Sequence, residues 1–226
     1  MQKEDTTNVI AQTKFSLPAR IVAHFFSYVF HPLFIPVIGT WYLAFIQEEY
    51  FAGIPSHDKG AVVLTVACLT ILFPGVTVLL LKGLGFIKSV FLRTQRERII
   101  PYVMNNIFYF SLYLFINHKE EVPSVLVAFI FGVFLASSVG LFFNTYYKIS
   151  MHGLGMGALT GLLLIVTYND PSAPAFAPMM TVLLLTGVVC TSRLMISDHS
   201  PFDIYTGVIL GVICQAIAAA FIGINT

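Results

Sequence analysis

The sequence predicts an all-α protein, a polytopic bundle of about six to seven transmembrane helices. Apolar residues make up 57% of the 226 residues and charged residues only 10%, a balance far from that of soluble proteins. The apolar residues gather into seven long runs, and a hydrocarbon core of about 30 Å requires roughly 20 apolar residues per helix. We therefore expect one integral membrane domain over residues 1–226, with residues 1–17 as a polar N-terminal tail.

The first apolar run differs from the other six because it is too long for one straight helix. The expected spans cover residues 20–47, 61–83, 101–117, 123–145, 152–168, 176–195 and 203–223. Pro32 and Pro36 interrupt the first run, so residues 18–47 form either one span or an interfacial helix, over residues 17–30, followed by a span. His24 and His31 fall there and are interpreted as interfacial or packing residues rather than ligands.

Small residues within the apolar runs are interpreted as packing elements. Gly153, Gly157 and Gly161 recur every fourth residue in the fifth run, a spacing that favours close helix packing. The three cysteines are expected to be small buried residues, so neither a disulfide nor a metal cluster is implied.

A stretch of ionisable groups, residues 192–203, lies between the last two apolar runs. Such groups are costly beside membrane-spanning segments unless they have partners, so this stretch is the leading candidate for an active site. Ser200 and Pro201 are typical of a helix start, which puts His199 just before the helix and Asp203 in its first turn. A carboxylate bonded to one imidazole nitrogen makes the other nitrogen a better nucleophile.

The same residues allow a structural interpretation. Ser200 and Asp203 fit a capping box, in which each side chain bonds the backbone N–H of the other residue. Such a cap needs no substrate, but it accounts for neither Ser192-Arg193 nor His199. The guanidinium of Arg193 also presents a fork of donors that suits a phosphate. On these residues alone, catalysis and helix capping both stay open.

The spacing of this stretch resembles the third motif of the type 2 phosphatidic acid phosphatase superfamily, which includes bacterial acid phosphatases and vanadium haloperoxidases. All four defining positions are present, as Ser192-Arg193, five residues, His199, three residues and Asp203. The resemblance implies a lipid phosphatase of phospholipid metabolism. It would hydrolyse a phosphomonoester or pyrophosphate through a phosphohistidine, without a metal or another cofactor.

The start of the fifth span is similar to the second motif of this superfamily, Pro-Ser-Gly-His. Ser150 and His152 match that motif, whereas Ile149 and Met151 replace its proline and glycine. The match is informative because of its position, since it lies two spans before the third motif.

The most basic segment, residues 82–98, corresponds only loosely to the first motif, which is Lys, six residues, Arg-Pro. Lys88 and Arg96 are one residue too far apart, and the proline after Arg98 comes only at Pro101. The segment also fits a solvated cytoplasmic loop that follows the positive-inside rule. Lys88, Arg96 and Arg98 are candidate phosphate ligands. The alternative is that they belong to an ordinary solvated loop that binds no phosphate.

The number of spans between these three clusters predicts that they share one membrane face. Two spans separate the basic segment from His152, and two more separate His152 from Arg193. Because an even number of crossings returns a chain to its starting face, the clusters are expected to converge.

The resemblance implies a role for each candidate residue. His199 would attack phosphorus while Asp203 orients it, and His152 would protonate the leaving oxygen and later activate water. The phosphate oxygens would be bound by Arg193, Arg98, Arg96, Ser150, Lys88 and Ser192. The expected partners are the bilayer and a lipid phosphate, such as phosphatidylglycerophosphate, phosphatidic acid, a lipid A phosphate or undecaprenyl pyrophosphate. A nucleic-acid partner is not expected, and the oligomeric state stays open.

Two indications disagree on which face holds the site. Ten of the 12 Lys and Arg residues fall on the motif face of the expected topology, so the positive-inside rule predicts the cytoplasmic side. Familiar bacterial members of the superfamily act at the periplasmic face, and they usually have three spans before the first motif rather than two. The resemblance implies a bacterial inner membrane in either case.

A second class of function also fits these residues. The first two motifs depart from the superfamily's pattern, so the alternative is a non-catalytic membrane protein or transporter that binds an anionic headgroup on the same scaffold. A phosphotransferase that uses the same phosphohistidine is a third possibility.

Overall fold

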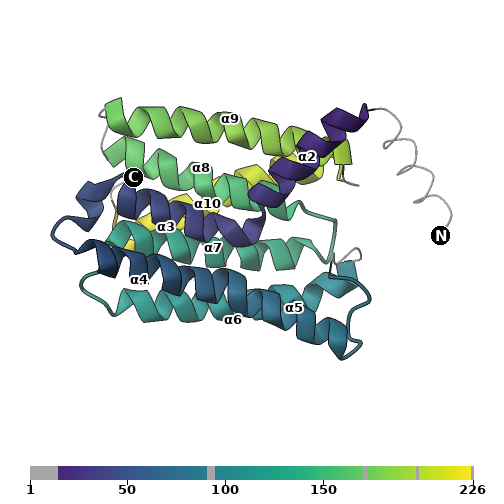
Figure 1. Ribbon diagram of the computed structural model, residues 1–226, viewed down its shortest axis with the longest axis horizontal. Helices are drawn as coiled ribbons and strands as arrows, with labels where there is room; N and C mark the ends of the chain where they lie inside the picture. The colour runs from purple at the N-terminus through teal and green to yellow at the C-terminus, as the bar shows by residue number, and fades with distance from the viewer. Residues whose placement is uncertain (1–14, 91–94, 170–172, 197–198, 225–226) are drawn as a thin grey trace.

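The computed structural model describes residues 15–90, 95–169, 173–196 and 199–224, and this part of the chain is all-helical (Figure 1). Within it, seven helical segments are long and apolar enough to cross a membrane. Their bounds are Leu17–Phe45, Ser56–Gly83, Ile99–Asn117, Ser124–Phe143, Met151–Asn169, Phe176–Ile196 and Pro201–Ile222. The predicted all-α membrane bundle is confirmed, and the chain is an integral membrane protein.

The first span is broken where the sequence predicts a break. It consists of helix α2 (Leu17–Val29), a short 3₁₀ turn η1 (Pro32–Phe34) and helix α3 (Ile35–Phe45). Prolines at the first turns of η1 and α3 cannot donate a backbone hydrogen bond, so one continuous helix cannot form. Helix α2 leaves the direction of the bundle and crosses α9 (Ala173–Ile196) (Figure 1). Leu17, the last residue of the expected tail, already belongs to α2, and residues 1–14 lie outside the described part.

The second span contains a wide turn that the sequence analysis did not predict. Helix α4 (Ser56–Ala67) continues through a π-helical turn, η3 (Cys68–Leu72), into α5 (Phe73–Gly83). Pro74 follows this turn and has no N–H for the carbonyl of Thr70, so the wider turn accommodates the missing bond. A short 3₁₀ turn, η2 (Glu48–Phe51), joins α3 to α4.

The remaining spans are single helices. They are α6 (Gln95–Asn117), α7 (Ser124–Phe143), α8 (Met151–Asn169), α9 and α10 (Pro201–Ile222). Helix α6 begins before Pro101, where the sequence analysis started the third span, so the end of the basic segment is helical. Pro101 lies in the second turn of α6 and has no N–H for the carbonyl of Glu97, so one intrahelical bond is missing there.

Glycines bring the backbones of α8 and α10 into direct contact. A Cβ atom on Gly153 would lie 2.6 Å from the Ile204 carbonyl oxygen, and one on Gly207 would lie 2.9 Å from the Ser150 carbonyl oxygen. A Cβ on Gly157 would overlap the carbonyl of Val208. The predicted role of the α8 glycines in close packing is therefore confirmed.

Polar side chains link α8 and α10 to other helices at membrane depth. The buried amide of Gln215 on α10 donates from Nε2 to the Phe129 carbonyl oxygen of α7 at 3.2 Å. The Thr160 hydroxyl of α8 lies 3.0 Å from that of Thr186 on α9. Thr186 gives its own proton to the Val182 carbonyl, so Thr160 is the donor between the two helices. Such bonds satisfy polar groups that hydrocarbon cannot.

Alternating helix directions gather the candidate residues at one end of the bundle. The end of α9 and the starts of α6, α8 and α10 all lie at the right of Figure 1, where α2 also lies. The parity argument therefore holds for the backbone positions of all three clusters.

Candidate active site

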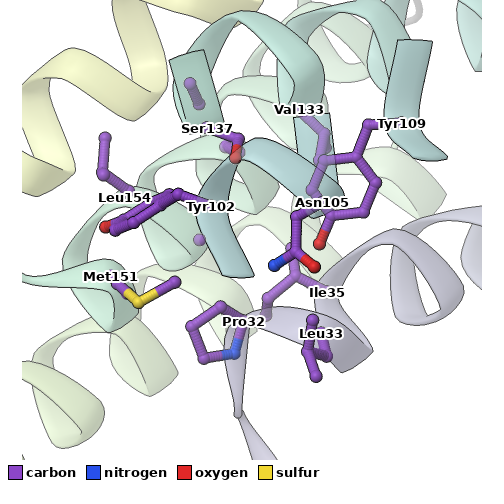
Figure 2. Close-up of a pocket in the computed structure, with 13 residues that line it drawn as sticks. Pro32, Leu33, Ile35, Tyr102, Asn105, Tyr109, Val133, Ser137, Met151 and Leu154 are labelled. Atoms are coloured by element: carbon purple, nitrogen blue, oxygen red, sulfur yellow. The ribbon is translucent and has the colours of Figure 1, made fainter. Parts of the chain in front are cut away.

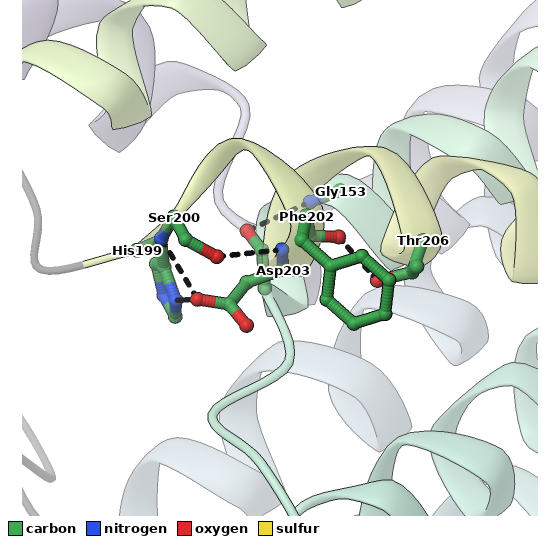
Figure 3. Close-up of polar contacts among 7 residues, drawn as sticks. Gly153, His199, Ser200, Phe202, Asp203 and Thr206 are labelled. Atoms are coloured by element: carbon green, nitrogen blue, oxygen red, sulfur yellow. Dashed lines mark hydrogen bonds and ion pairs between the residues drawn. The ribbon is translucent and has the colours of Figure 1, made fainter.

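Helix α10 begins with the capping box that the sequence predicts. The Ser200 hydroxyl accepts the Asp203 N–H at 3.2 Å, and Asp203 Oδ2 accepts the Ser200 N–H at 2.8 Å (Figure 3). Pro201 occupies the first turn, where its missing N–H has no cost. The capping interpretation of these residues is thus correct.

The same carboxylate faces His199. Its Oδ2 lies 3.9 Å from His199 Nδ1, which is an ion-pair distance and longer than the about 2.7–3.2 Å of a hydrogen bond (Figure 3). The two side chains are only 4% and 14% exposed. Because Nδ1 faces the carboxylate, Nε2 is the ring nitrogen on the opposite side. Asp203 Oδ2 therefore both caps helix α10 and forms the ion pair with His199.

Ser150 fixes the start of α8 against the start of α10. Its backbone N–H donates to the Asp203 carbonyl oxygen at 3.1 Å, and its hydroxyl accepts the Gly153 N–H at 3.2 Å. Ser150 is fully buried. This backbone bond holds the stretch resembling the second motif directly against the stretch resembling the third, and a hydroxyl that accepts one bond still has a proton to donate.

His152 lies at the centre of a group of ionisable side chains. Its Nε2 is 3.0 Å from the Ser27 carbonyl oxygen on α2. A carbonyl only accepts, so Nε2 carries a proton and, in the neutral ring, Nδ1 is the basic nitrogen. Arg193, His31 and His199 are all close enough to His152 to interact with it electrostatically. We call these four residues the histidine cluster.

Arg193 reaches this cluster from the last turn of α9. It interacts electrostatically with both His152 and His31. The neighbouring Ser192 is buried, and its hydroxyl donates to the Val188 carbonyl at 2.8 Å within α9. The charge of Arg193 therefore acts on both imidazoles, whereas the proton of Ser192 is used inside its own helix.

The basic segment is described only in part. Lys88 is exposed in the loop after α5, and its backbone N–H donates to Glu97 Oε1 at 3.0 Å. The backbone of Arg96 and Arg98 belongs to the first turn of α6, at the same end of the bundle as the histidine cluster, but their side chains lie outside the described residues. The hydrogen bond described for Lys88 thus goes to Glu97 rather than to a residue of the cluster.

His31 is the residue of the cluster that the sequence analysis missed. It was interpreted as a packing or interfacial residue, and its ring does pack edge to face on that of His152, with centroids 5.5 Å apart. No motif includes it. The one local signal is its position before Pro32, where the first span breaks and turns a side chain toward α8.

An apolar pocket lies beside the cluster, between η1, α6, α7 and α8 (Figure 2). Its empty volume, which includes space open to the surroundings, is about 460 Å³. Pro32 and Met151, the residues next to His31 and His152, line one part of it, and Tyr102, Asn105 and Tyr109 of α6 line another. The pocket therefore offers apolar space next to the polar group of residues.

The part of the chain that the structure describes shows no candidate metal site beside this geometry. Among the described residues, no three His, Cys, Asp or Glu side chains are arranged to hold a metal ion. Comparisons with protein-family models, curated proteins and solved structures find no match to this chain.

Proposed function

We propose that this protein hydrolyses a lipid phosphate or pyrophosphate through a phosphohistidine intermediate. The observation that carries the proposal is the meeting of His152, His199 and Arg193 at one end of a membrane bundle. Two imidazoles and a guanidinium are the groups that phosphoryl transfer through histidine requires, namely a nucleophile, an acid and a charge stabiliser. The resemblance to the type 2 phosphatidic acid phosphatase motifs assigns the same three roles.

In the first step, His199 Nε2 attacks phosphorus and the bond to the leaving oxygen breaks. Asp203, 3.9 Å from Nδ1, stabilises the positive charge that develops on the ring. The negative charge of the bound phosphate favours the protonated form of His152, which gives its Nδ1 proton to the leaving oxygen while the Ser27 carbonyl holds the opposite nitrogen. Arg193 binds the non-bridging oxygens.

In the second step, water attacks the phosphohistidine. His152 Nδ1, now unprotonated, takes a proton from the water as the new P–O bond forms. The P–N bond breaks, and His199 and inorganic phosphate are released. The proton that His152 gave in the first step is thereby restored.

The apolar pocket supports a lipid as the substrate. A headgroup phosphate at the histidine cluster would leave its hydrocarbon chain next to Met151 and Pro32, which line the pocket (Figure 2). Because the chain comes from hydrocarbon, its contribution there would come from packing contacts rather than from removal from water. We further propose that the site opens on the cytoplasmic face of a bacterial inner membrane, because the motif end carries most of the Lys and Arg residues.

The test is release of phosphate from a lipid phosphate in mixed micelles containing EDTA, since the proposed chemistry uses fixed donors in place of a cation. The His199→Ala variant should fall to background and form no acid-labile phosphoenzyme. His57→Ala is the matched control, because His57 is 81% exposed and pairs only with the adjacent Asp58 among the described contacts. Retention of turnover by His199→Ala would remove the proposed nucleophile.

One observation favours a second candidate, a non-catalytic protein that binds an anionic headgroup. Asp203 Oδ2 is hydrogen bonded within the α10 cap and lies beyond hydrogen-bond distance from His199. An imidazole whose carboxylate is shared with a helix cap gains less nucleophilicity from it. Binding of a lipid phosphate with no release of phosphate would support this candidate. Transfer of the phosphoryl group to an added alcohol would instead identify a phosphotransferase.

A further inference from the structure

The break between α2 and α3 holds His31 in one tautomer. His31 Nδ1 accepts the Leu33 N–H at 3.3 Å at the start of η1. A backbone N–H can only donate, so the lone pair of Nδ1 is used in this bond. The neutral ring must then carry its proton on Nε2, on the side away from its own backbone turn. His31 is therefore a hydrogen-bond donor even when it is uncharged.

This donor belongs to the histidine cluster. The rings of His31 and His152 meet edge to face, with centroids 5.5 Å apart and an interplanar angle of 84°. Arg193 acts electrostatically on both rings. An anion bound between Arg193 and His152 would consequently lie next to the ring of His31.

The N-terminal segment holds both imidazoles through its backbone. The Ser27 carbonyl binds His152, and the Leu33 N–H binds His31. Ser27 is 5% exposed, and α2 packs on α9, the helix that carries Arg193. Fixed donors cost little reorganisation when a charged group binds. The segment therefore fixes a donor ring beside His152 and also fixes the acid.

We propose that His31 is a third imidazole of the site, which donates its Nε2 proton to a non-bridging oxygen of a bound phosphate group. This inference rests on the proposed function for the identity of the substrate, and it adds a binding residue from outside all three motif-like stretches. The recognised chemistry is a phosphate dianion, supplied either by a lipid headgroup or by free inorganic phosphate.

Two variants of the full chain separate hydrogen bonding from packing. His31→Phe keeps a ring against His152 but removes both nitrogens, whereas His31→Gln keeps an N–H donor near the position of Nε2. A hydrogen bond to a charged group corresponds to about a tenfold or larger change in affinity. His31→Phe should raise the KM for a lipid phosphate and the inhibition constant of inorganic phosphate by about tenfold, and His31→Gln should recover most of this loss.

The matched control is His24→Phe on α2, because His24 is exposed and stacks on Tyr28 at 6.3 Å. It should leave both constants unchanged. Binding of inorganic phosphate and of a lipid phosphate is also measured by calorimetry on the inactive His199→Ala chain, with and without His31→Phe. Loss of affinity for both ligands identifies a phosphate contact, and loss for the lipid alone identifies a headgroup contact.

Equal phosphate affinity with and without His31→Phe would overturn the inference and leave the proposed hydrolysis intact. A parent chain that binds phosphate through His31 but releases none from lipids would overturn the hydrolysis and keep the inference. If His31→Phe does not fold, His31→Leu takes its place as the variant without a donor, and equal phosphate affinity in His31→Leu and His31→Gln would overturn the inference.

Discussion

Asp203 serves two neighbours with one carboxylate oxygen. Oδ2 accepts the Ser200 N–H and faces His199 Nδ1. The first contact requires only an oxygen, whereas the second depends on the negative charge. These two contributions can be separated because an asparagine oxygen accepts a hydrogen bond but carries no charge.

Asp203→Asn should reduce kcat about 100-fold, since the imidazolium that forms on His199 loses its counter-charge. The free energy of unfolding should change by less than about 1 kcal/mol, because the amide oxygen keeps the bond to the Ser200 N–H. Ser200→Ala should show the reverse, with normal turnover and a loss of about 1 kcal/mol of stability. Turnover and thermal unfolding in the same micelles measure both effects, and full activity in Asp203→Asn would contradict the role of its charge in stabilising the His199 ring.

At the scale of elements, the α8–α10 contact positions the site. Glycines on both helices allow backbone contact, and the bond from the Ser150 N–H to the Asp203 carbonyl joins the two helix starts. His152 and His199 are attached to this pair. Any side chain that separates the helices should therefore also separate the imidazoles.

Gly157→Ala should destabilise the bundle by about 1–3 kcal/mol, because the new Cβ meets the Val208 carbonyl and backbone must move. Gly187→Ala on α9 is the control, since a Cβ there has nothing within 4 Å. That variant should be neutral or slightly more stable, by up to about 1 kcal/mol. Thermal unfolding in detergent compares the two, and equal stability would show that the interface tolerates a wider spacing.

At the scale of the whole molecule, the number of crossings decides which residues meet. Seven apolar segments alternate in direction, so the basic segment and the starts of α8 and α10 lie at one end. The opposite end carries the acidic residues Glu48, Glu49, Glu120 and Glu121 in its turns. The charge distribution therefore predicts a cytoplasmic motif end.

Single cysteines at the two ends test that orientation. Tyr146→Cys is at the motif end, after α7, and Glu120→Cys is in the turn between α6 and α7 at the other end. In intact cells, a membrane-impermeant maleimide should label Glu120→Cys and should label Tyr146→Cys only after lysis. The parent chain, whose three cysteines lie within spans, gives the background. The opposite pattern would put the site on the outer face.

Much of this architecture could be predicted from the sequence, because spans of hydrocarbon thickness and proline breaks are local signals. The π-helical turn before Pro74 was missed because a proline in an apolar run shows a missing N–H but not whether the helix kinks, breaks or widens there. The cap of α10 was predicted from Ser200 and Asp203. His31 was missed because its contact with His152 joins segments far apart in the chain, as does the bond between Ser27 and His152, which are 125 residues apart.

The glycine contact between α8 and α10 limits how far the distance between His152 and His199 can change. A shift of one helix along the other by a single residue, about 1.5 Å, would break the bond between the Ser150 amide and the Asp203 carbonyl. The distance between His152 and His199 is thus set by the position of the α8 backbone along the α10 backbone. Insertions in the distant turns between α3 and α4 or between α6 and α7 should leave that separation untouched.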